Sequence, residues 1–242
     1  MFKGLQNSLL SLIYPQECHV CDRQVEGLDD GVACHGCWDS TRFFKGNEML
    51  CAKCGAFFGD EAAPIAVYCH KCDDHFYDRA VAAGVYEKAL SATIIELKST
   101  PILPRCIETA LAAAIRRGPF ENIDLILPIP LSRQRRHERG FNQAEIIAGA
   151  VSRVSGIAVD VVSLARKTHT PIHRIGMDQK ARELTVQNAF VVTRPKLIAG
   201  KNILLVDDVF TSGATASYCA KILKKKGAGK VNVFTLARAV MH

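Results

Sequence analysis

Two groups of residues in this sequence could carry chemistry: eight cysteines near the N-terminus and a pair of acids near the C-terminus. The cysteines form four C-x-x-C pairs, and Asp207 and Asp208 directly follow the apolar run at residues 203–206. Thiolates at this spacing are typical zinc ligands. Carboxylates at the end of a buried strand are suited to accept hydrogen bonds from a polar ligand. The sequence therefore presents a candidate metal region and a candidate ligand site.

The four cysteine pairs are spaced as in zinc ribbons. Two residues between cysteines let both thiolates face one cation, and two such knuckles complete a tetrahedral site. The strict, repeated spacing and a reducing compartment argue against disulfides. The spacing allows an interleaved pairing, but we expect two structural zinc sites in series. Their ligands would be Cys18, Cys21, Cys34 and Cys37 in the first site and Cys51, Cys54, Cys69 and Cys72 in the second.

The charge of the chain changes sign between its two parts. Residues 1–78 have a net charge of −6, whereas residues 79–242 have a net charge of +13. This contrast predicts a zinc ribbon region at 1–78 and a second domain at 79–242. Zinc-bound thiolates would make the first region more negative still, so we expect a structural role there and not nucleic-acid binding.

No apolar run approaches the roughly 18 residues of a membrane span. We interpret the N-terminus as a short amphipathic helix with Leu5, Leu9 and Leu12 on one face, and not as a signal peptide. These features favour a cytoplasmic protein.

The second domain alternates between strand and helix patterns. We expect strands at residues 80–86, 123–130, 189–192, 202–208 and 231–238, and helices at residues 87–98, 105–117, 141–155 and 214–226. This alternation predicts an α/β fold, with a parallel sheet flanked by helices.

The acid pair would lie at the carboxyl edge of that sheet, where ligands of α/β proteins bind. The small residues that follow, Thr211 to Thr215, fall at the start of a helix, where free N–H groups and the helix dipole favour an anion. Carboxylates that accept hydrogen bonds from sugar hydroxyls, beside a loop that binds phosphate, fit a ribose 5-phosphate as the ligand. A receiver domain is excluded because only residues 209–242 follow the acids, and the segment at 227–232 lacks the final hydroxyl residue of a nucleotide P-loop.

The stretch ILLVDDVFTSGAT resembles the signature of type I phosphoribosyltransferases. Together with RRHERGFNQAEIIA at 135–148 and the four cysteine knuckles, it is similar to the ComF family of competence-associated and gluconate-associated bacterial proteins. The resemblance implies a type I phosphoribosyltransferase-like domain that binds phosphoribosyl pyrophosphate (PRPP) with Mg²⁺, with Asp207 and Asp208 as catalytic acids. It also implies that residues 166–189 close over PRPP. The implied PRPP-binding residues are Asp207, Asp208, Thr211, Ser212, Gly213, Ala214 and Thr215.

A basic cluster follows the strand expected at 123–130. It consists of Ser132, Arg133, Arg135, Arg136 and Arg139. Arginines here could bind pyrophosphate, contact a DNA backbone or form a solvated basic surface. Two functions therefore remain open. The first is phosphoribosyl transfer from PRPP to an unidentified acceptor, and the second is a non-catalytic role in PRPP sensing or in handling single-stranded DNA together with DNA-uptake proteins.

Overall fold

The computed structural model describes residues 15–61, 63–118, 120–167 and 189–240. Two expectations fall outside this part of the chain. They concern the N-terminal helix with Leu5, Leu9 and Leu12, and residues 168–188 of the segment that was expected to close over PRPP.

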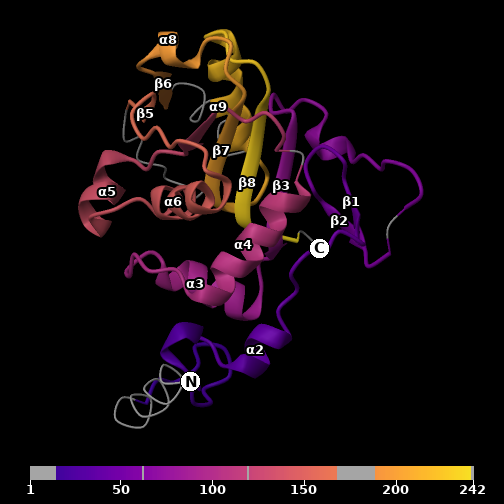
Figure 1. The fold of residues 1–242 in the computed structure, drawn as a ribbon, viewed down its shortest axis with the longest axis vertical. Helices are drawn as coiled ribbons and strands as arrows, with labels where there is room; N and C mark the ends of the chain where they lie inside the picture. Colours follow the sequence, from indigo (N-terminus) through magenta and orange to yellow (C-terminus); the bar gives the residue numbers. More distant parts are fainter. Residues whose placement is uncertain (1–14, 62, 119, 168–188, 241–242) are drawn as a thin grey trace, which may run out of the picture.

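A four-stranded parallel sheet forms the centre of the protein, in the order β3-β8-β7-β4 (Figure 1). Its strands are β3 (Arg79–Val85), β4 (Leu125–Pro128), β7 (Ile203–Phe210) and β8 (Val231–Arg238). The α/β fold with a parallel sheet is therefore confirmed. Strand β8 lies between β3 and β7. Local sequence patterns do not specify this strand order.

The sheet is buried on both faces, as expected of parallel strands. Alternate residues of β7 belong to different cores: Leu204 and Val206 lie on one side, Ile203 and Leu205 on the other. Every residue of β8 is buried. The two central strands, β7 and β8, are therefore held firmly in place, because both of their faces pack against other side chains.

Helices cover both faces of the sheet (Figure 1). The core on the side of Leu204 and Val206 contains apolar residues of α3, α4 and α6. The core on the side of Ile203 and Leu205 contains apolar residues of α9 and of the strand β6 (Phe190–Val192). These elements are α3 (Lys88–Glu96), α4 (Arg105–Arg117), α6 (Gln143–Ser155) and α9 (Ala214–Lys225). All four match the helices expected from the sequence within a few residues. Helix α9 ends with Lys224 and Lys225 in its last turn, and Gly227 just beyond has a φ of 87°.

Both edges of the sheet are covered by the chain itself. Phe43 forms an antiparallel bridge with Gly84 of β3, and Val159 forms a parallel bridge with Ile126 of β4. A Cβ on Gly84 would lie 2.5 Å from the carbonyl oxygen of Arg42, so only glycine permits this close approach. Covered edges do not offer free backbone groups to other chains.

Four elements differ from the expectation or were not foreseen. The expected strand at 189–192 forms as β6 (Phe190–Val192), but it pairs antiparallel with β5 (Leu164–Arg166) in a separate two-stranded sheet. Helices α5 (Arg133–Arg139) and α8 (Pro195–Ile198) were not expected. Within the described ranges, none of the helices is long and apolar enough to cross a membrane.

Candidate metal centres and ligand site

The eight N-terminal cysteines form two separate clusters in series. Cys18, Cys21, Cys34 and Cys37 make the first, and Cys51, Cys54, Cys69 and Cys72 make the second. Within each cluster all sulfur atoms lie within 4.8 Å of one another. The serial pairing is therefore confirmed, and the interleaved alternative is not observed. His19, His35 and His70, which lie next to cysteines of these pairs in the sequence, belong to neither four-cysteine cluster.

The sulfur positions fit zinc and not disulfides. Sγ···Sγ separations are 3.7 Å for Cys18 and Cys37 and 3.5 Å for Cys54 and Cys69. A tetrahedron with Zn–S bonds of about 2.3 Å has edges of about 3.8 Å, whereas a disulfide bond is about 2.05 Å long. All ten cysteines are free of disulfides. Each cluster can thus hold one structural zinc ion through four thiolates.

Short elements hold the two clusters in place. The first ribbon (residues 15–41) contains η1 (Leu28–Asp30) and α2 (His35–Asp39), and the second ribbon (residues 49–74) contains β1 (Met49–Leu50), β2 (Phe57–Gly59) and η2 (His70–Cys72). The first ribbon packs into the core beside α3 and α4, and the second into the core beside α9. In Figure 1 the two ribbons lie on different sides of the molecule.

Asp207 and Asp208 lie within β7, which continues to Phe210. The strand therefore does not end at the acids, contrary to the expected range, and Asp207 pairs in register with Thr235 of β8. Both carboxylates are partly buried. Asp207 Oδ1 accepts a hydrogen bond from the Asp208 amide at 3.0 Å, and Asp208 Oδ1 accepts one from the Val209 amide at 2.7 Å. Each acid is thus fixed by the amide of the next peptide.

The environment of the acid pair disfavours two negative charges. Burial raises the pKa of Asp207 well above the usual value of an aspartate, and the neighbouring charge of Asp208 raises it further. Burial also raises the pKa of Cys219, which lies beneath on α9, and the charge of Asp207 adds to this effect. A ligand that donates hydroxyl hydrogen bonds or brings a cation would relieve this repulsion.

The loop after β7 forms a small pocket at the start of α9. A cavity of about 50 Å³ is lined by Asp207, residues 209–216, Val233 and Thr235. Drug-sized ligands need about 300–1,000 Å³, so this space suits a small group. The first turn of α9 supplies N–H groups without intrahelical partners, and Thr211 and Ser212 expose hydroxyls beside it. Asp207 and the predicted phosphate loop therefore line the same pocket.

Gly213 shapes this loop through its left-handed backbone, with φ 79°. A Cβ at this position would lie 2.5 Å from Phe210 Cζ and 3.1 Å from His75 Cε1. Glycine is therefore required here for both its conformation and its space. His75 follows the second ribbon, so the metal region directly borders the loop.

The segment after the second ribbon is bonded to the ligand site along its length. His75 Nδ1 lies 2.6 Å from the Tyr77 hydroxyl, and the buried Tyr77 ring meets Phe210 edge-on at 5.8 Å between centroids. The Phe76 amide donates to Ser217 Oγ at 3.1 Å, and Lys224 pairs with Asp78 at 2.9 Å. No sequence motif predicts a role for these residues.

Arg238 joins the second metal cluster to the same strand. Its guanidinium lies 4.6 Å above the centre of the Phe210 ring. It also donates to the carbonyl oxygen of Cys54 and lies 3.5 Å from the Cys54 sulfur. A single buried cation thus contacts both a metal ligand and the residue that precedes the phosphate loop.

The predicted basic cluster forms helix α5, and none of the helix residues is buried. Ser132, itself buried, caps the helix by accepting a hydrogen bond from the Arg135 amide at 3.3 Å. Arg136 pairs with Glu145 of α6. Ser132 is therefore a capping residue in this structure, while Arg133, Arg135 and Arg139 extend from the helix after β4.

Two further polar residues lie beside this helix. Asn142 is buried, caps α6 through the Ala144 amide at 3.1 Å and donates to the Ile129 carbonyl at 3.0 Å. Gln143 is also buried, and its side-chain nitrogen has no hydrogen-bond partner among the described residues. From their place at the start of a helix, either residue could cap the helix or touch a ligand. The structure assigns capping to Asn142.

Comparison with known proteins identifies both regions of the chain. Residues 9–73 match the family model of a double zinc ribbon domain. "Competence protein F" of Haemophilus influenzae is 30% identical over 231 residues, which cover 92% of this chain and 96% of that protein. The chain belongs to the ComF (competence protein F) family.

Other relatives carry names that refer to DNA utilization or to competence. "DNA utilization protein YhgH" of Salmonella typhi is 28% identical over 239 residues, 95% of this chain and 100% of that protein. "Competence protein ComFC" of Bacillus subtilis is 34% identical over 120 residues, 48% of this chain and 45% of that protein.

Similar solved structures include a glutamine PRPP amidotransferase from B. subtilis, with a TM-score of 0.37 and 19% identity over 61% of this chain and 26% of that one. A purine phosphoribosyltransferase from Pyrococcus horikoshii has a TM-score of 0.33 and 20% identity over 55% of this chain and 70% of that one. At these TM-scores the overall likeness is weak, and the reading of the site rests on its local geometry.

The two clusters predict two zinc ions per chain. Cys21→Ser and Cys69→Ser should each lower the zinc content from two equivalents to about one, because each site needs four thiolates. Cys106→Ser, outside both clusters, should keep two. Zinc in the purified full-length chain is measured by mass spectrometry of the element. Two equivalents retained in both cluster variants would contradict the assignment.

The raised pKa of Asp207 predicts that the wild-type acid costs stability at neutral pH. The folded state holds the proton of Asp207 more tightly than the unfolded chain does. The loss of folding free energy therefore begins as the pH rises above the usual aspartate pKa, and it is complete above the raised pKa of folded Asp207. Asp207→Asn removes it and keeps the acceptor for the Asp208 amide. We expect the Tm of Asp207→Asn at pH 8 to lie above that of the wild type, by about 2–4 °C for each kcal/mol by which the substitution increases the free energy of unfolding. The gain should shrink toward pH 4.

The control for this measurement is Glu121→Gln, which removes an exposed charge. Its Tm should follow that of the wild type at both pH values. An Asp207→Asn protein that melts at or below the wild-type temperature at pH 8 would show that the buried charge is not a source of instability.

Proposed function

We propose that the chain binds PRPP and transfers its phosphoribosyl group to an acceptor, with release of pyrophosphate. The observation on which this proposal depends is the adjacency of the acid pair on β7 to the glycine-containing loop at the start of α9. Carboxylates for two hydroxyls beside N–H donors for a phosphate match the two ends of a ribose 5-phosphate. The signature that predicted this arrangement covers the same residues.

In this proposal each part of the site has one task. Asp207 and Asp208 accept hydrogen bonds from the ribose 2′ and 3′ hydroxyls, while the loop from Thr211 to Thr215 holds the 5-phosphate. The fixed sheet keeps the sugar in place as positive charge develops on it, so orientation supplies a large part of the rate. Arginines of α5 meet the charge that develops on the leaving pyrophosphate. Mg²⁺ bound with PRPP would supply charge neutralisation for that leaving group.

The proposal extends to the organisation of the chain. Residues 79–242 are the ligand-binding domain and residues 1–78 the zinc ribbon region. The protein would work in the cytoplasm, where reducing conditions keep eight thiols available for zinc. The bond from Arg238 to Cys54 of the second ribbon, and the bond from Phe76, just after this ribbon, to Ser217 of α9, support a structural role for the metal in the ligand site.

Calorimetric titration with ribose 5-phosphate and with PRPP plus Mg²⁺ tests the proposal. Asp208→Asn should weaken both ligands by about 10- to 100-fold, because a charge-assisted hydrogen bond contributes about 1.5–3 kcal/mol. Asp124→Asn is the matched control, since Asp124 is a partly exposed acid that pairs with Lys201 away from the loop. A zinc-loaded wild type that binds neither ligand would refute PRPP binding, as would equal binding by Asp208→Asn.

A second candidate function is non-catalytic handling of single-stranded DNA in DNA uptake. The observation that favours it is helix α5, a basic helix without a buried residue, in which Arg133 and Arg135 form no ion pair with any described residue. The names of the ComF relatives agree with such a role. The two functions are compatible, because the helix lies after β4 and the phosphate loop after β7.

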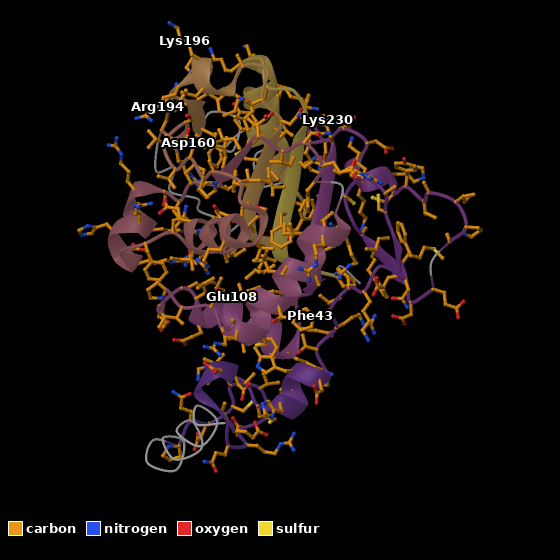
Figure 2. All side chains as sticks on the ribbon, in the orientation of Figure 1. Phe43, Glu108, Asp160, Arg194, Lys196 and Lys230 are labelled. Atoms are coloured by element: carbon orange, nitrogen blue, oxygen red, sulfur yellow. The ribbon has the colours of Figure 1, made fainter. Side chains whose placement is uncertain are left out.

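Salt dependence separates this candidate from PRPP binding. Arg133→Gln should lower the slope of log affinity against log salt for a labelled single-stranded oligonucleotide by about 0.7, the value for one phosphate contact. Lys230→Gln is the control, because Lys230 is exposed and lies away from α5, as its label in Figure 2 shows. This variant should leave the slope unchanged. Equal slopes for wild type and Arg133→Gln, measured by fluorescence anisotropy, would exclude this helix as the DNA contact.

A further inference from the structure

Arg238 is a buried arginine whose side chain reaches the second metal cluster. It is 8% exposed, and its guanidinium donates to the carbonyl oxygen of Cys54 and lies 3.5 Å from the Cys54 sulfur. Among the described residues, no acid forms an ion pair with it. A buried guanidinium is costly unless acceptors satisfy it. The conformation of Arg238 therefore depends on the position of Cys54, a ligand of the second cluster.

The same guanidinium also contacts the strand that leads into the phosphate loop. It lies 4.6 Å from the centre of the Phe210 ring, and Phe210 pairs in register with Arg238 across β7 and β8. The Phe210 ring lies directly against the loop, because a Cβ on Gly213 would be 2.5 Å from Phe210 Cζ. A continuous chain of contacts thus runs from Cys54 through Arg238 and Phe210 to the residue that precedes α9.

A second route joins the same cluster to the same glycine. The His75 amide donates to the carbonyl oxygen of Cys72, another ligand of the second cluster, at 3.1 Å. The His75 ring borders the loop, since its Cε1 would lie 3.1 Å from a Cβ on Gly213. Its Nδ1 lies 2.6 Å from the hydroxyl of the buried Tyr77, whose ring packs on Phe210. Movement of either cysteine knuckle would therefore disturb the packing around Gly213.

The first metal cluster has no comparable connection to the loop within the described ranges. The arginine beside it is Arg23, an exposed residue whose Nε lies 3.4 Å from Cys21 Sγ. The buried cysteines of the first cluster belong to the core that contains α3, α4 and α6, whereas those of the second belong to the core that contains Phe210 and α9. The contacts thus link the phosphate loop to one of the two clusters.

We propose that Arg238 is a positioning residue that couples zinc binding at the second cluster to phosphate binding at the loop of residues 211–215. The four thiolates of that cluster fix the knuckle around Cys54 when they hold a metal ion. Without the ion the knuckle loosens and the buried guanidinium loses its acceptors, so Arg238 no longer holds the Phe210 ring against the loop. By linkage, a ligand on the loop must also strengthen zinc binding at the second cluster. The inference rests on the proposed function, because it assigns a regulation to the same phosphate site.

Variants that keep a single cluster test this coupling. Cys21→Ser removes the first zinc site and Cys69→Ser the second, and the zinc affinity of the remaining site in each full-length chain is measured by competition with a chromophoric chelator. The probe is ribose 5-phosphate at saturation. We expect it to raise the zinc affinity of the Cys21→Ser chain by about fivefold or more, the lower end of ordinary coupling between sites. The zinc affinity of the Cys69→Ser chain should not change.

Replacement of Arg238 shows whether this residue carries the coupling. In the double variant Cys21→Ser/Arg238→Gln, ribose 5-phosphate should no longer change the zinc affinity. A merely structural role of Arg238 would lower the stability and leave the ligand effect in place. The matched control is Arg79→Gln in the Cys21→Ser chain, because the exposed Arg79 donates to the Ala52 carbonyl oxygen of the same ribbon at 3.0 Å. This control should keep the ligand effect.

Hydrogen exchange adds a measure that needs no ligand. With two zinc ions bound, amides of residues 209–217 should exchange about tenfold faster in Arg238→Gln than in the wild type, because a charge-assisted hydrogen bond that supports the loop is lost. Exchange in α4 and α6 should stay the same, which shows that the variant is folded. If a variant is unfolded, the wild type still tests the coupling, because ribose 5-phosphate should raise the zinc affinity of one of its two sites and not of the other.

The outcomes separate this inference from the proposed function. If ribose 5-phosphate binds but leaves the zinc affinity of the second site unchanged, the coupling is wrong and PRPP binding stands. If ribose 5-phosphate does not bind, the proposed function fails, and hydrogen exchange tests the coupling alone: equal rates at residues 209–217 in the wild type and Arg238→Gln overturn it. A ligand effect that persists in Cys21→Ser/Arg238→Gln removes Arg238 from the path and also overturns the inference.

Discussion

The proposed ligand site depends on the contact between the second zinc ribbon and the end of β7. Phe210 lies at the centre of this contact, with Tyr77 at its edge and the Arg238 guanidinium over its face. Arg238 in turn bonds to Cys54, a ligand of the second metal cluster. Because Phe210 leads directly into the loop at Gly213, the metal cluster, the acid pair and the loop form one packed unit. The zinc ribbon is therefore part of the framework of the site and not a separate attachment.

The electrostatics of the site follow from this framework. Burial and the neighbouring charge of Asp208 raise the pKa of Asp207, whereas burial and the charge of Arg135 lower the pKa of Arg166. Each half is unfavourable by itself, since like charges are held together where water cannot screen them well. A ligand that has hydroxyls in one part and anionic groups in another would stabilise both the acid pair and the arginines. The free protein thus retains local instability where a sugar phosphate would be stabilised.

Much of this arrangement could be predicted from local patterns in the sequence. The spacing of Cys18, Cys21, Cys34 and Cys37 fixes a metal site because four nearby thiolates have few other uses. The helix boundaries of α4 and α9 follow from proline, glycine and charge signals. The acid pair was recognisable because two carboxylates after a buried apolar run require a reason.

The parts that could not be predicted depend on contacts between distant residues. Helix α5 has no apolar face, so its sequence shows no helical periodicity, and β5 is only three residues long. The pairing of Arg166 with Phe190 spans a segment whose length gives no information about register. Tyr77, Phe210 and Arg238 meet only because β8 lies between β3 and β7. No local pattern encodes that strand order.

A crystal structure of the zinc-loaded chain with ribose 5-phosphate tests the central claim most directly. We predict the phosphate within about 3 Å of backbone N–H groups at residues 213–215, a normal hydrogen-bond distance, with the ribose hydroxyls on Asp207 and Asp208. His75 and Phe210 should retain their contacts with the loop in that complex. A phosphate bound only at α5, with the loop at Gly213 empty, would contradict the account.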